Sequence, residues 1–344
     1  MTTSHDVQGE SFFLNLRFLL IICVFAGNAL EPLVGSIHLA QQWFSWIFMF
    51  HMPLFVLVTG YFAKTTLTGL AGQKVLLQIG MQYLIFQSLY SILDVVIFHV
   101  PHIHHSFFAP YLLLWFLASH ICWRLLMLSF QKIPPVFQLG ISVLLGILVG
   151  YLPVDGIWLS VCRTFVYLPY FVAGYHLHYA DVRRFFTTPV RIIAGIVSLL
   201  LMVLAGTSYF GIPAGWLYGN MTYGELGHTE WYAGIYRIGI YGVQWIASMA
   251  FLSFVPAVTG RITEMGRRTL YVFLLHGLIV RSVVAKGVYE YIDTPVEVML
   301  ILVCATGLCC LLTMPWVRTA TRPLIEPQVE WMLKPAPYLF RRSA

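Results

Sequence analysis

Long apolar stretches, separated by shorter polar connections, repeat along the whole chain. About 20 apolar residues are enough to cross the hydrocarbon core of a bilayer as an α-helix. No long polar linker divides the chain, so we expect one domain over residues 1–344. The pattern predicts an all-α polytopic membrane bundle of about ten helices. The ten apolar stretches lie near residues 15–34, 43–62, 75–98, 110–130, 137–153, 158–178, 190–210, 232–255, 269–286 and 296–317.

The basic residues predict how such a bundle is oriented. They gather in alternate connections and in the C-terminal tail, and cytoplasmic connections are the ones enriched in Lys and Arg. We therefore expect a multi-pass protein of the cell membrane with both termini in the cytoplasm. The residues concerned are Lys64, Lys74, Arg124, Lys132, Arg183, Arg184, Arg191, Arg261, Arg267, Arg268, Arg318, Arg322, Lys334, Arg341 and Arg342.

The composition agrees with a membrane location. Hydrophobic residues make up 59% of the 344 residues and charged residues 10%, against about 25% charged residues in soluble domains. The net charge of +6 follows the topology signal, so we expect a lipid bilayer as partner and no nucleic acid. The first ten residues, MTTSHDVQGE, lack the basic region of a signal peptide, and we expect the first apolar run to remain as a membrane helix.

Four polar residues in the first two apolar runs are candidates for chemistry. They are Arg17, Asn28 and Glu31 in the first run and His51 in the second. Polar groups inside a membrane are costly and usually functional. At a rise of about 1.5 Å per residue, Asn28 lies about 16 Å deeper than Arg17. The chemistry of the protein is therefore expected between these two helices.

Each of these residues has a structural and a functional interpretation. Arg17 can be a topological anchor whose long side chain reaches the interface, or it can hold the phosphates of a cytoplasmic donor such as an acyl-CoA. His51, and His276 in the ninth run, can join helices by hydrogen bonds or serve as a general base. Asn28 cannot take up a proton at neutral pH, so it can orient a substrate or polarise a carbonyl group but cannot be the base.

Three arginines are exceptions to the enrichment of basic residues in cytoplasmic connections, because they lie in the outward halves of apolar runs. Arg163, Arg237 and Arg281 need counter-charges there, and Asp94 and Glu31 are candidate partners. Arg237 follows an outward loop over residues 211–232 that mixes aromatic rings with amides and carboxylates. Such a loop suits sugar recognition, and it equally suits an aromatic belt at the membrane interface.

The sequence offers little support for a metal site. His102, His104 and His105 form an HxHH cluster in a short loop, which rarely completes a ligand shell without a carboxylate or a further histidine. The six cysteines have neither CxxC nor Cys/His spacing and lie in apolar runs. We therefore expect no metal cofactor.

Several passages together resemble the acyltransferase 3 superfamily of integral membrane O-acyltransferases, and within it the branch of fucose 4-O-acetylase and related acetyltransferases. They are NLRFLLIICVFAGNALEPL, WIFMFHMPLFVLVTGYF, LLLWFLASHICWRLL, RTFVYLPYFVAGYHL, GWLYGNMTYGEL, IYRIGIYGVQWIASMAFLSFVPAV and RTLYVFLLHGLIV. The resemblance implies a membrane enzyme that moves an acyl group, usually acetyl from acetyl-CoA or another acyl-CoA, onto a hydroxyl of a cell-surface or lipid-linked carbohydrate.

The resemblance also bears on individual residues. The family pattern has an arginine followed eleven residues later by a histidine presumed to be the catalytic base. Here Arg17 matches, and Asn28 stands where that histidine belongs. The third run also departs from its relatives, since it reads QIGMQYLIFQ with Gln78 and Gln82 and without their proline. The candidate catalytic residues are His51, Asn28 and Arg17, and the candidate substrate-binding residues are Glu31, Trp115, Arg163, Tyr223, Arg237 and His276.

These observations leave two functional hypotheses from different classes. The first is an active O-acyltransferase in which His51 or His276 replaces the missing base. The second is a member of the family that has lost its chemistry and acts as a glycan-binding or accessory membrane protein. A transporter is less favoured, because neither inverted repeats nor paired broken helices are seen in the sequence.

Overall fold

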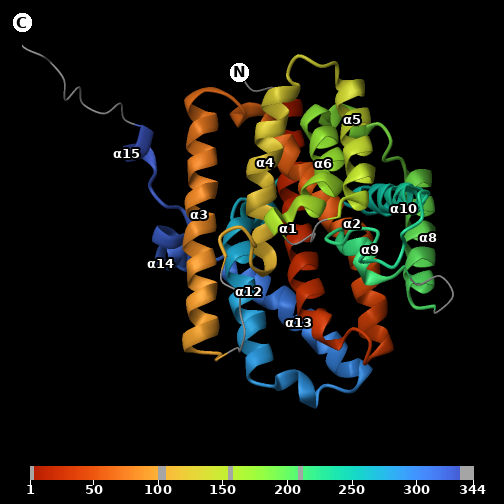
Figure 1. Ribbon diagram of the computed structural model, residues 1–344, viewed down its shortest axis with the longest axis vertical. Coiled ribbons are helices and arrows are strands. Elements are labelled where there is room, and N and C mark those ends of the chain that lie inside the picture. The colour runs from red at the N-terminus through yellow and green to blue at the C-terminus, as the bar shows by residue number, and fades with distance from the viewer. Residues whose placement is uncertain (1–3, 100–105, 154–157, 208–211, 334–344) are drawn as a thin grey trace, which may run out of the picture.

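The computed structural model describes residues 4–99, 106–153, 158–207 and 212–333, and in this part of the chain the secondary structure consists of helices, without a strand. A long helix lies at each of the ten predicted stretches (Figure 1). These helices are α1 (Ser4–Leu30), α2 (His38–Ala63), α3 (Gly69–Val96), α4 (Trp115–Phe130), α5 (Pro135–Leu148), α6 (Val161–His176), α8 (Thr188–Ala205), α10 (Gly234–Leu252), α12 (Thr269–Ala285) and α13 (Pro295–Leu312).

Six of the helical segments in the described residues are long and apolar enough to cross a membrane, judged by length and composition. They are Gln8–Leu33, His38–Thr66, Gly69–Val96, Leu112–Phe130, Thr188–Ala205 and Pro295–Leu312. Pro135–Tyr151 and Thr269–Ala285 are shorter apolar helices, and α6 has only 16 residues. The protein is therefore a multi-pass membrane protein, while the count of ten spans stays a prediction.

Helix α2 lies in the middle of the bundle and contacts α1, α6, α8 and α10. It buries side chains on every face, as expected for a helix that is apolar all round. Its approach to α6 is close, because Gly60 meets the carbonyl of Phe171 and Gly174 meets the carbonyl of Leu57. A Cβ atom at either glycine would overlap these backbone atoms. Small residues thus set the position of the helix that carries His51.

The register of α1 is fixed by one buried amide, that of Asn15. Its Nδ2 donates to the carbonyls of Pro256 and Val258 at 2.8 and 3.0 Å, and its Oδ1 accepts from the hydroxyl of Thr263 at 2.7 Å. Thr263 belongs to the short helix α11 (Arg261–Gly266), which precedes α12. Because Arg17 follows two residues later on α1, these bonds also fix where its side chain begins.

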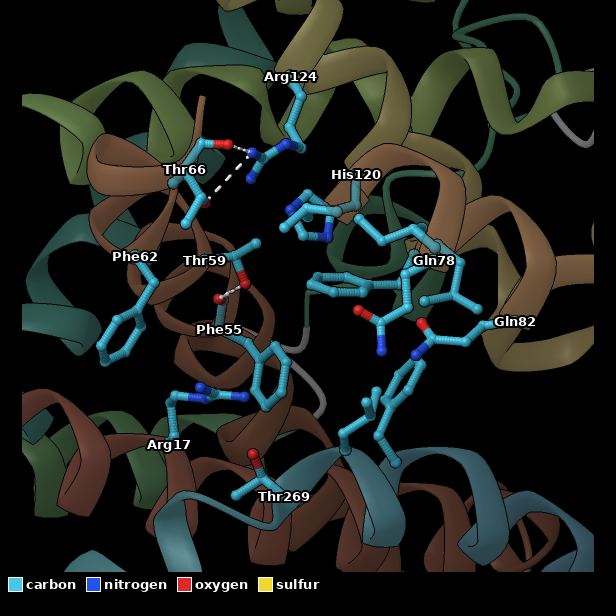
Figure 2. A pocket seen from close by; sticks show the side chains of 17 residues that line it. Arg17, Phe55, Thr59, Phe62, Thr66, Gln78, Gln82, His120, Arg124 and Thr269 are labelled. Atoms are coloured by element: carbon cyan, nitrogen blue, oxygen red, sulfur yellow. Dashed lines mark hydrogen bonds between the residues drawn. The ribbon is translucent and has the colours of Figure 1, made fainter. Parts of the chain in front are cut away.

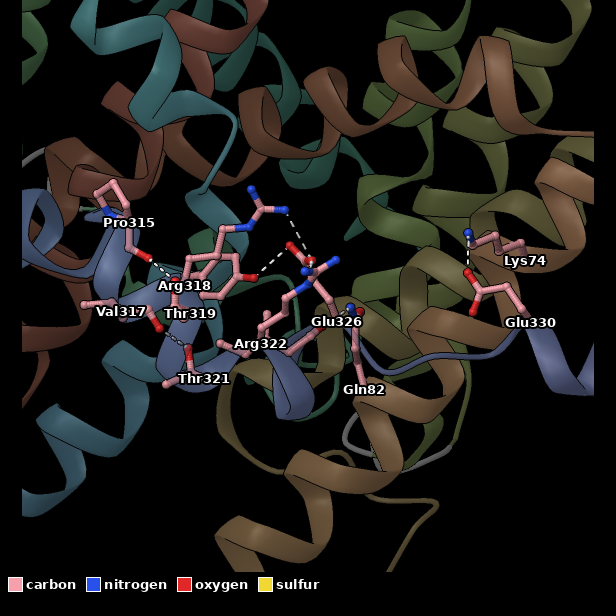
Figure 3. A network of polar contacts seen from close by, with 12 residues as sticks. Lys74, Gln82, Pro315, Val317, Arg318, Thr319, Thr321, Arg322, Glu326 and Glu330 are labelled. Carbon is pink, nitrogen blue, oxygen red and sulfur yellow. Dashed lines mark hydrogen bonds and ion pairs between the residues drawn. The ribbon is translucent and has the colours of Figure 1, made fainter.

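The chain after α13 folds back against α3 and α12 as two short helices, α14 (Pro315–Ile325) and α15 (Glu330–Leu333), along one edge of the bundle (Figure 1). We call residues 315–333 the tail. Glu326 attaches it to α12 by accepting a hydrogen bond from Tyr271 at 2.7 Å, and within the tail it accepts from Arg322 at 3.2 Å and Arg318 at 3.4 Å (Figure 3). Lys74 pairs with Glu330 at 2.6 Å.

Protonation of Glu326 should loosen the tail. Partial burial raises the pKa of this carboxyl, but hydrogen bonds from Tyr271 and Arg318 outweigh burial and hold the pKa below its ordinary value. A lowered pKa in the folded state stabilises the attachment above about pH 4.3, the usual pKa of Glu, and the stabilisation is lost as pH falls through the folded-state pKa. We expect Glu326→Gln to cost about 1 kcal/mol at neutral pH.

Hydrogen exchange of the tail amides measures this effect. Exchange over residues 315–333 should be faster in Glu326→Gln than in the wild type at pH 7. The exposed Glu290 serves as control, and Glu290→Gln should leave the tail unchanged. Equal exchange in Glu326→Gln and wild type would show that Glu326 does not hold the tail.

Candidate functional site

Two cavities inside the bundle contain most of the candidate residues. The first, of about 270 Å³, is lined by α1, α2, α3, α4 and α12, and we call it the Arg17 cavity. The second, of about 320 Å³, is the His51 cavity. Both volumes are near the lower end of the range for small-molecule sites. The His51 cavity brings together six of the nine candidates, namely Asn28, Glu31, His51, Trp115, Arg163 and His276.

The Arg17 cavity has cationic walls without a counter-charge, since neither Asp nor Glu lines it. The guanidinium of Arg17 lies 5.3 Å from the centre of the Phe62 ring, and among the described residues it has neither a hydrogen bond nor an ion pair. Figure 2 shows Arg17 and Arg124 toward opposite ends of the cavity, with Thr59 and His120 between them. Two cations in a partly enclosed, mostly apolar space favour an anionic ligand.

Arg124 and His120 were missed as site residues by sequence reasoning, which counted Arg124 among the topology signals. Arg124 is only 2% exposed and donates through Nη2 to the backbone carbonyl and the hydroxyl of Thr66. Its Nε and the Nε2 of His120 are buried and have no partner in the described part of the chain. The available signal was the spacing of Phe116, His120 and Arg124, which places all three on one face of α4.

Gln78 and Gln82, which mark the unusual third run, also line the Arg17 cavity. The Nε2 of Gln82 donates to the carbonyl of Ile325 at 2.7 Å, so one wall of the cavity is joined to the tail (Figure 3). The departure from the family pattern therefore lies in a wall of this cavity rather than on the lipid-facing side of α3.

His51 is the better placed of the two histidines to act as a base. The ring is 2% exposed, and its Nδ1 lies 2.8 Å from the carbonyl of Ile47. A carbonyl can only accept, so Nδ1 carries the proton and Nε2 keeps its lone pair. No described residue hydrogen-bonds to this Nε2. Phe48 packs edge-on against the ring at 4.4 Å between ring centres and holds its orientation.

His276 has both ring nitrogens engaged. Its Nδ1 donates to the carbonyls of Val272 and Phe273 at 2.9 and 2.8 Å, which leaves Nε2 as the acceptor. Asn28 donates to this Nε2 through Nδ2 at 3.2 Å and to the carbonyl of Val24 through the same nitrogen at 2.9 Å. Both protons of the Asn28 amide are thus used, and its Oδ1 has no partner among the described residues. Asn28 therefore offers the His51 cavity a hydrogen-bond acceptor rather than support for an oxyanion.

Further polar side chains of this cavity are those of Glu31, Arg163 and Arg281. Arg281 pairs with the buried Asp94 at 2.9 Å, which confirms Asp94 as a counter-charge for one of the three arginines that depart from the topology signal. Glu31 accepts from the hydroxyl of Tyr218 at 2.7 Å. Arg163 lies over the ring of Trp115 at 4.8 Å, and its buried Nε lacks a partner in the described part of the chain.

The candidates Tyr223 and Arg237 lie apart from both cavities. Arg237 is 1% exposed, donates to the carbonyl of Trp216 at 2.9 Å and lies over the Trp216 ring at 5.1 Å. The hydroxyl of Tyr223 donates to the carbonyl of Ile147 at 2.8 Å. In the structure these residues fasten the aromatic loop to α5 and α10, and they do not line the space around His51.

Three phenylalanine rings separate the two cavities. Phe116 and Phe273 line both, and their ring centres are 5.5 Å apart. Phe55, in the wall of the Arg17 cavity, packs 5.4 Å from Phe116 and 6.4 Å from Phe273. We call Phe55, Phe116 and Phe273 the aromatic wall. Its rings come from α2, α4 and α12, so only the folded bundle forms it.

The described residues contain no group of three or more His, Cys, Asp or Glu side chains that can hold a metal ion. His102, His104 and His105 lie outside the described residues.

Comparison with known proteins gives one match. The sequence model of the acyltransferase 3 family, described as an acyltransferase domain, matches residues 12–314. This range includes every residue that lines the two cavities and ends just before the tail. No curated protein and no solved structure matches the chain. From the extent of the family match, the chain belongs to the acyltransferase 3 family of membrane O-acyltransferases.

Proposed function

We propose that this protein transfers acetyl from acetyl-CoA to a hydroxyl of a cell-surface or lipid-linked carbohydrate, as in the fucose 4-O-acetylase-like branch. The observation that carries the proposal is the pair of cavities on either side of the aromatic wall. One is cationic and lacks acids, which suits the phosphates of a coenzyme. The other contains His51 with a free Nε2, which suits the activation of a hydroxyl.

In the proposed reaction the acetyl thioester passes between Phe116 and Phe273 from the Arg17 cavity. The acceptor hydroxyl gives its proton to Nε2 of His51, and its oxygen attacks the thioester carbonyl. A carbon–oxygen ester bond forms, the carbon–sulfur bond breaks, and the coenzyme leaves as its thiol after taking up one proton. Oδ1 of Asn28 accepts a hydrogen bond from the sugar and orients it beside His51.

We further propose that the chain forms one integral membrane domain with both termini in the cytoplasm, and that the Arg17 cavity faces the cytoplasm. The distribution of basic residues supports this orientation. Thr66, which lines the Arg17 cavity, belongs to the connection between α2 and α3 that carries Lys64, and Lys74 lies near the start of α3. This orientation puts the cavity on the side where acyl-CoA is made.

The acceptor would bind among Glu31, Trp115 and Arg163 in the His51 cavity. A carboxylate, a guanidinium and an indole give a sugar both hydrogen-bond partners and a flat apolar surface. Because Arg163 already covers the Trp115 ring, we expect hydrogen bonding to contribute more than stacking to acceptor affinity.

Removal of His51 or Arg17 should affect different kinetic parameters. His51→Ala removes the base and should lower kcat by about 10²- to 10⁴-fold with little change in KM. Arg17→Met removes a phosphate contact and should mainly raise KM for acetyl-CoA. Acetyl transfer by purified protein in nanodiscs, with host-envelope glycans as acceptor, measures both. His99→Ala, a change at an exposed site, is the control, and full activity of both test variants would disprove this mechanism.

Substitution of Asn28 tests whether its departure from the family pattern abolishes catalysis. Asn28→Ala loses one hydrogen bond to the acceptor and should lower kcat about tenfold or less. Asn28→His should transfer acetyl at least as well as wild type, because it adds a second base. Transfer by Asn28→His alone, with silent wild type, would contradict the proposal and favour a glycan-binding or accessory role for the natural protein.

The aromatic wall should limit the size of the acyl group. We expect the wild type to prefer acetyl-CoA over butyryl-CoA and hexanoyl-CoA. Phe116→Ala or Phe273→Ala should shift kcat/KM toward the longer groups by about tenfold, since one methylene in an apolar pocket changes selectivity by this order. Phe251→Ala, a change in a ring that lines neither cavity, should leave the preference unchanged. An unaltered preference in both wall variants would show that the acyl group takes another path.

A further inference from the structure

A third hollow, of about 860 Å³, lies beside the Arg17 cavity at the end of α2. Its walls come from the N-terminal part of α1, the end of α2 with the turn Lys64–Thr66, and the short helix α7 (Tyr179–Arg183) with its flanks. We call it the Lys64 groove. The residues used below are Phe62, Lys64, His178, Tyr179, Arg183 and Arg184, all of which line it.

The groove carries an excess of positive charge. Lys64, Arg183 and Arg184 line it, and the one acidic residue in its wall, Glu10, is already paired with Arg267 at 2.9 Å. Arg183 and Arg184 are exposed and have weak partners. Arg183 contacts Oε1 of Gln8 at 3.2 Å, and Arg184 lies 3.8 Å from Asp181. Their guanidinium groups are therefore available to a phosphate.

The groove and the Arg17 cavity meet at one ring. Phe62 lines both, and it is also the ring over which Arg17 lies. The boundary between the two hollows also passes between neighbouring residues, because Thr65 lines the groove and Thr66 lines the cavity. A ligand that spans both hollows would cross the end of α2 beside Phe62.

Membrane topology explains why the residues of the groove are basic, but it does not explain why Lys64, Arg183 and Arg184 line the same hollow. Basic residues are expected throughout connections on the cytoplasmic side. Arg191, in α8, and Arg261, in α11, carry the same topology signal, and neither lines the groove. Lys64 and Arg183 come from connections more than 100 residues apart in sequence, and folding brings them to one hollow.

We propose that the Lys64 groove binds the phosphate-bearing nucleotide end of the acyl-CoA donor, while the pantetheine arm extends past Phe62 into the Arg17 cavity. This inference rests on the proposed function. Guanidinium groups match the geometry of phosphate oxygens and hold them by paired hydrogen bonds. His178 and Tyr179 add ring surfaces on which a purine can stack. The nucleotide would supply affinity, and Arg17 would direct the thioester toward the aromatic wall.

Direct binding measurements on the full-length protein in nanodiscs test this assignment without any transfer reaction. Calorimetry would compare CoA, 3′-dephospho-CoA and pantetheine as probes. The test variant is Arg183→Met/Arg184→Met, and the matched control is Arg191→Met/Arg261→Met. We expect wild type and control to bind CoA about tenfold more tightly than 3′-dephospho-CoA. The test variant should lose most of this difference and bind pantetheine as wild type does, which also shows that it is folded.

Two outcomes would overturn the assignment of the nucleotide to the Lys64 groove. They differ in whether the proposed function also fails. If wild type binds CoA and the test variant binds each of the three probes with the wild-type affinity, the nucleotide lies elsewhere and the proposed function stands. If wild type binds none of the probes, the acyl-CoA donor is wrong and the proposed function fails with the inference.

Discussion

A cation inside an apolar bundle needs a nearby anion. This protein places two cationic side chains, those of Arg17 and Arg124, in a cavity whose walls contain no acidic residue. Burying an unpaired charge is expensive, so such an arrangement is understandable where a ligand supplies the missing charge. The contrast with Arg281, which is paired with Asp94 at 2.9 Å, makes the point clear. The fold satisfies Arg281 internally and leaves Arg17 and Arg124 facing a hollow. Asn15 and the glycines between α2 and α6 serve this arrangement, because they fix the helices that carry Arg17 and His51.

The helices and part of the site were predictable from the sequence, and the rest depended on three-dimensional packing. Hydropathy located the ten long helices of the described residues because each contains a continuous apolar run. The same reasoning took Arg124 for a topology signal, since span boundaries are uncertain by several residues and the side chain faces inward from the last turns of α4. The aromatic wall could not be predicted, because Phe55, Phe116 and Phe273 look like ordinary core residues until three helices bring them together. Tyr223 and Arg237 seemed close to a substrate because they belong to or follow an aromatic loop, but their side chains are used to anchor that loop.

Asn28, which departs from the family pattern, is accommodated by hydrogen bonds to its immediate neighbours. Its amide protons bond to His276 and Val24, so the two residues form a fixed polar pair in the wall of the His51 cavity. This pair occupies the Nε2 of His276 and leaves that of His51 free. In the proposed reaction the base therefore lies on α2 instead of α1.

A sidedness measurement shows whether the acetyl group crosses the aromatic wall. Sealed proteoliposomes containing the protein would enclose host-envelope glycans and receive radiolabelled acetyl-CoA only from outside. We expect label to accumulate in the enclosed glycans with wild type and not with His51→Ala. Label that enters glycans only when they share a compartment with acetyl-CoA would contradict transfer across the wall.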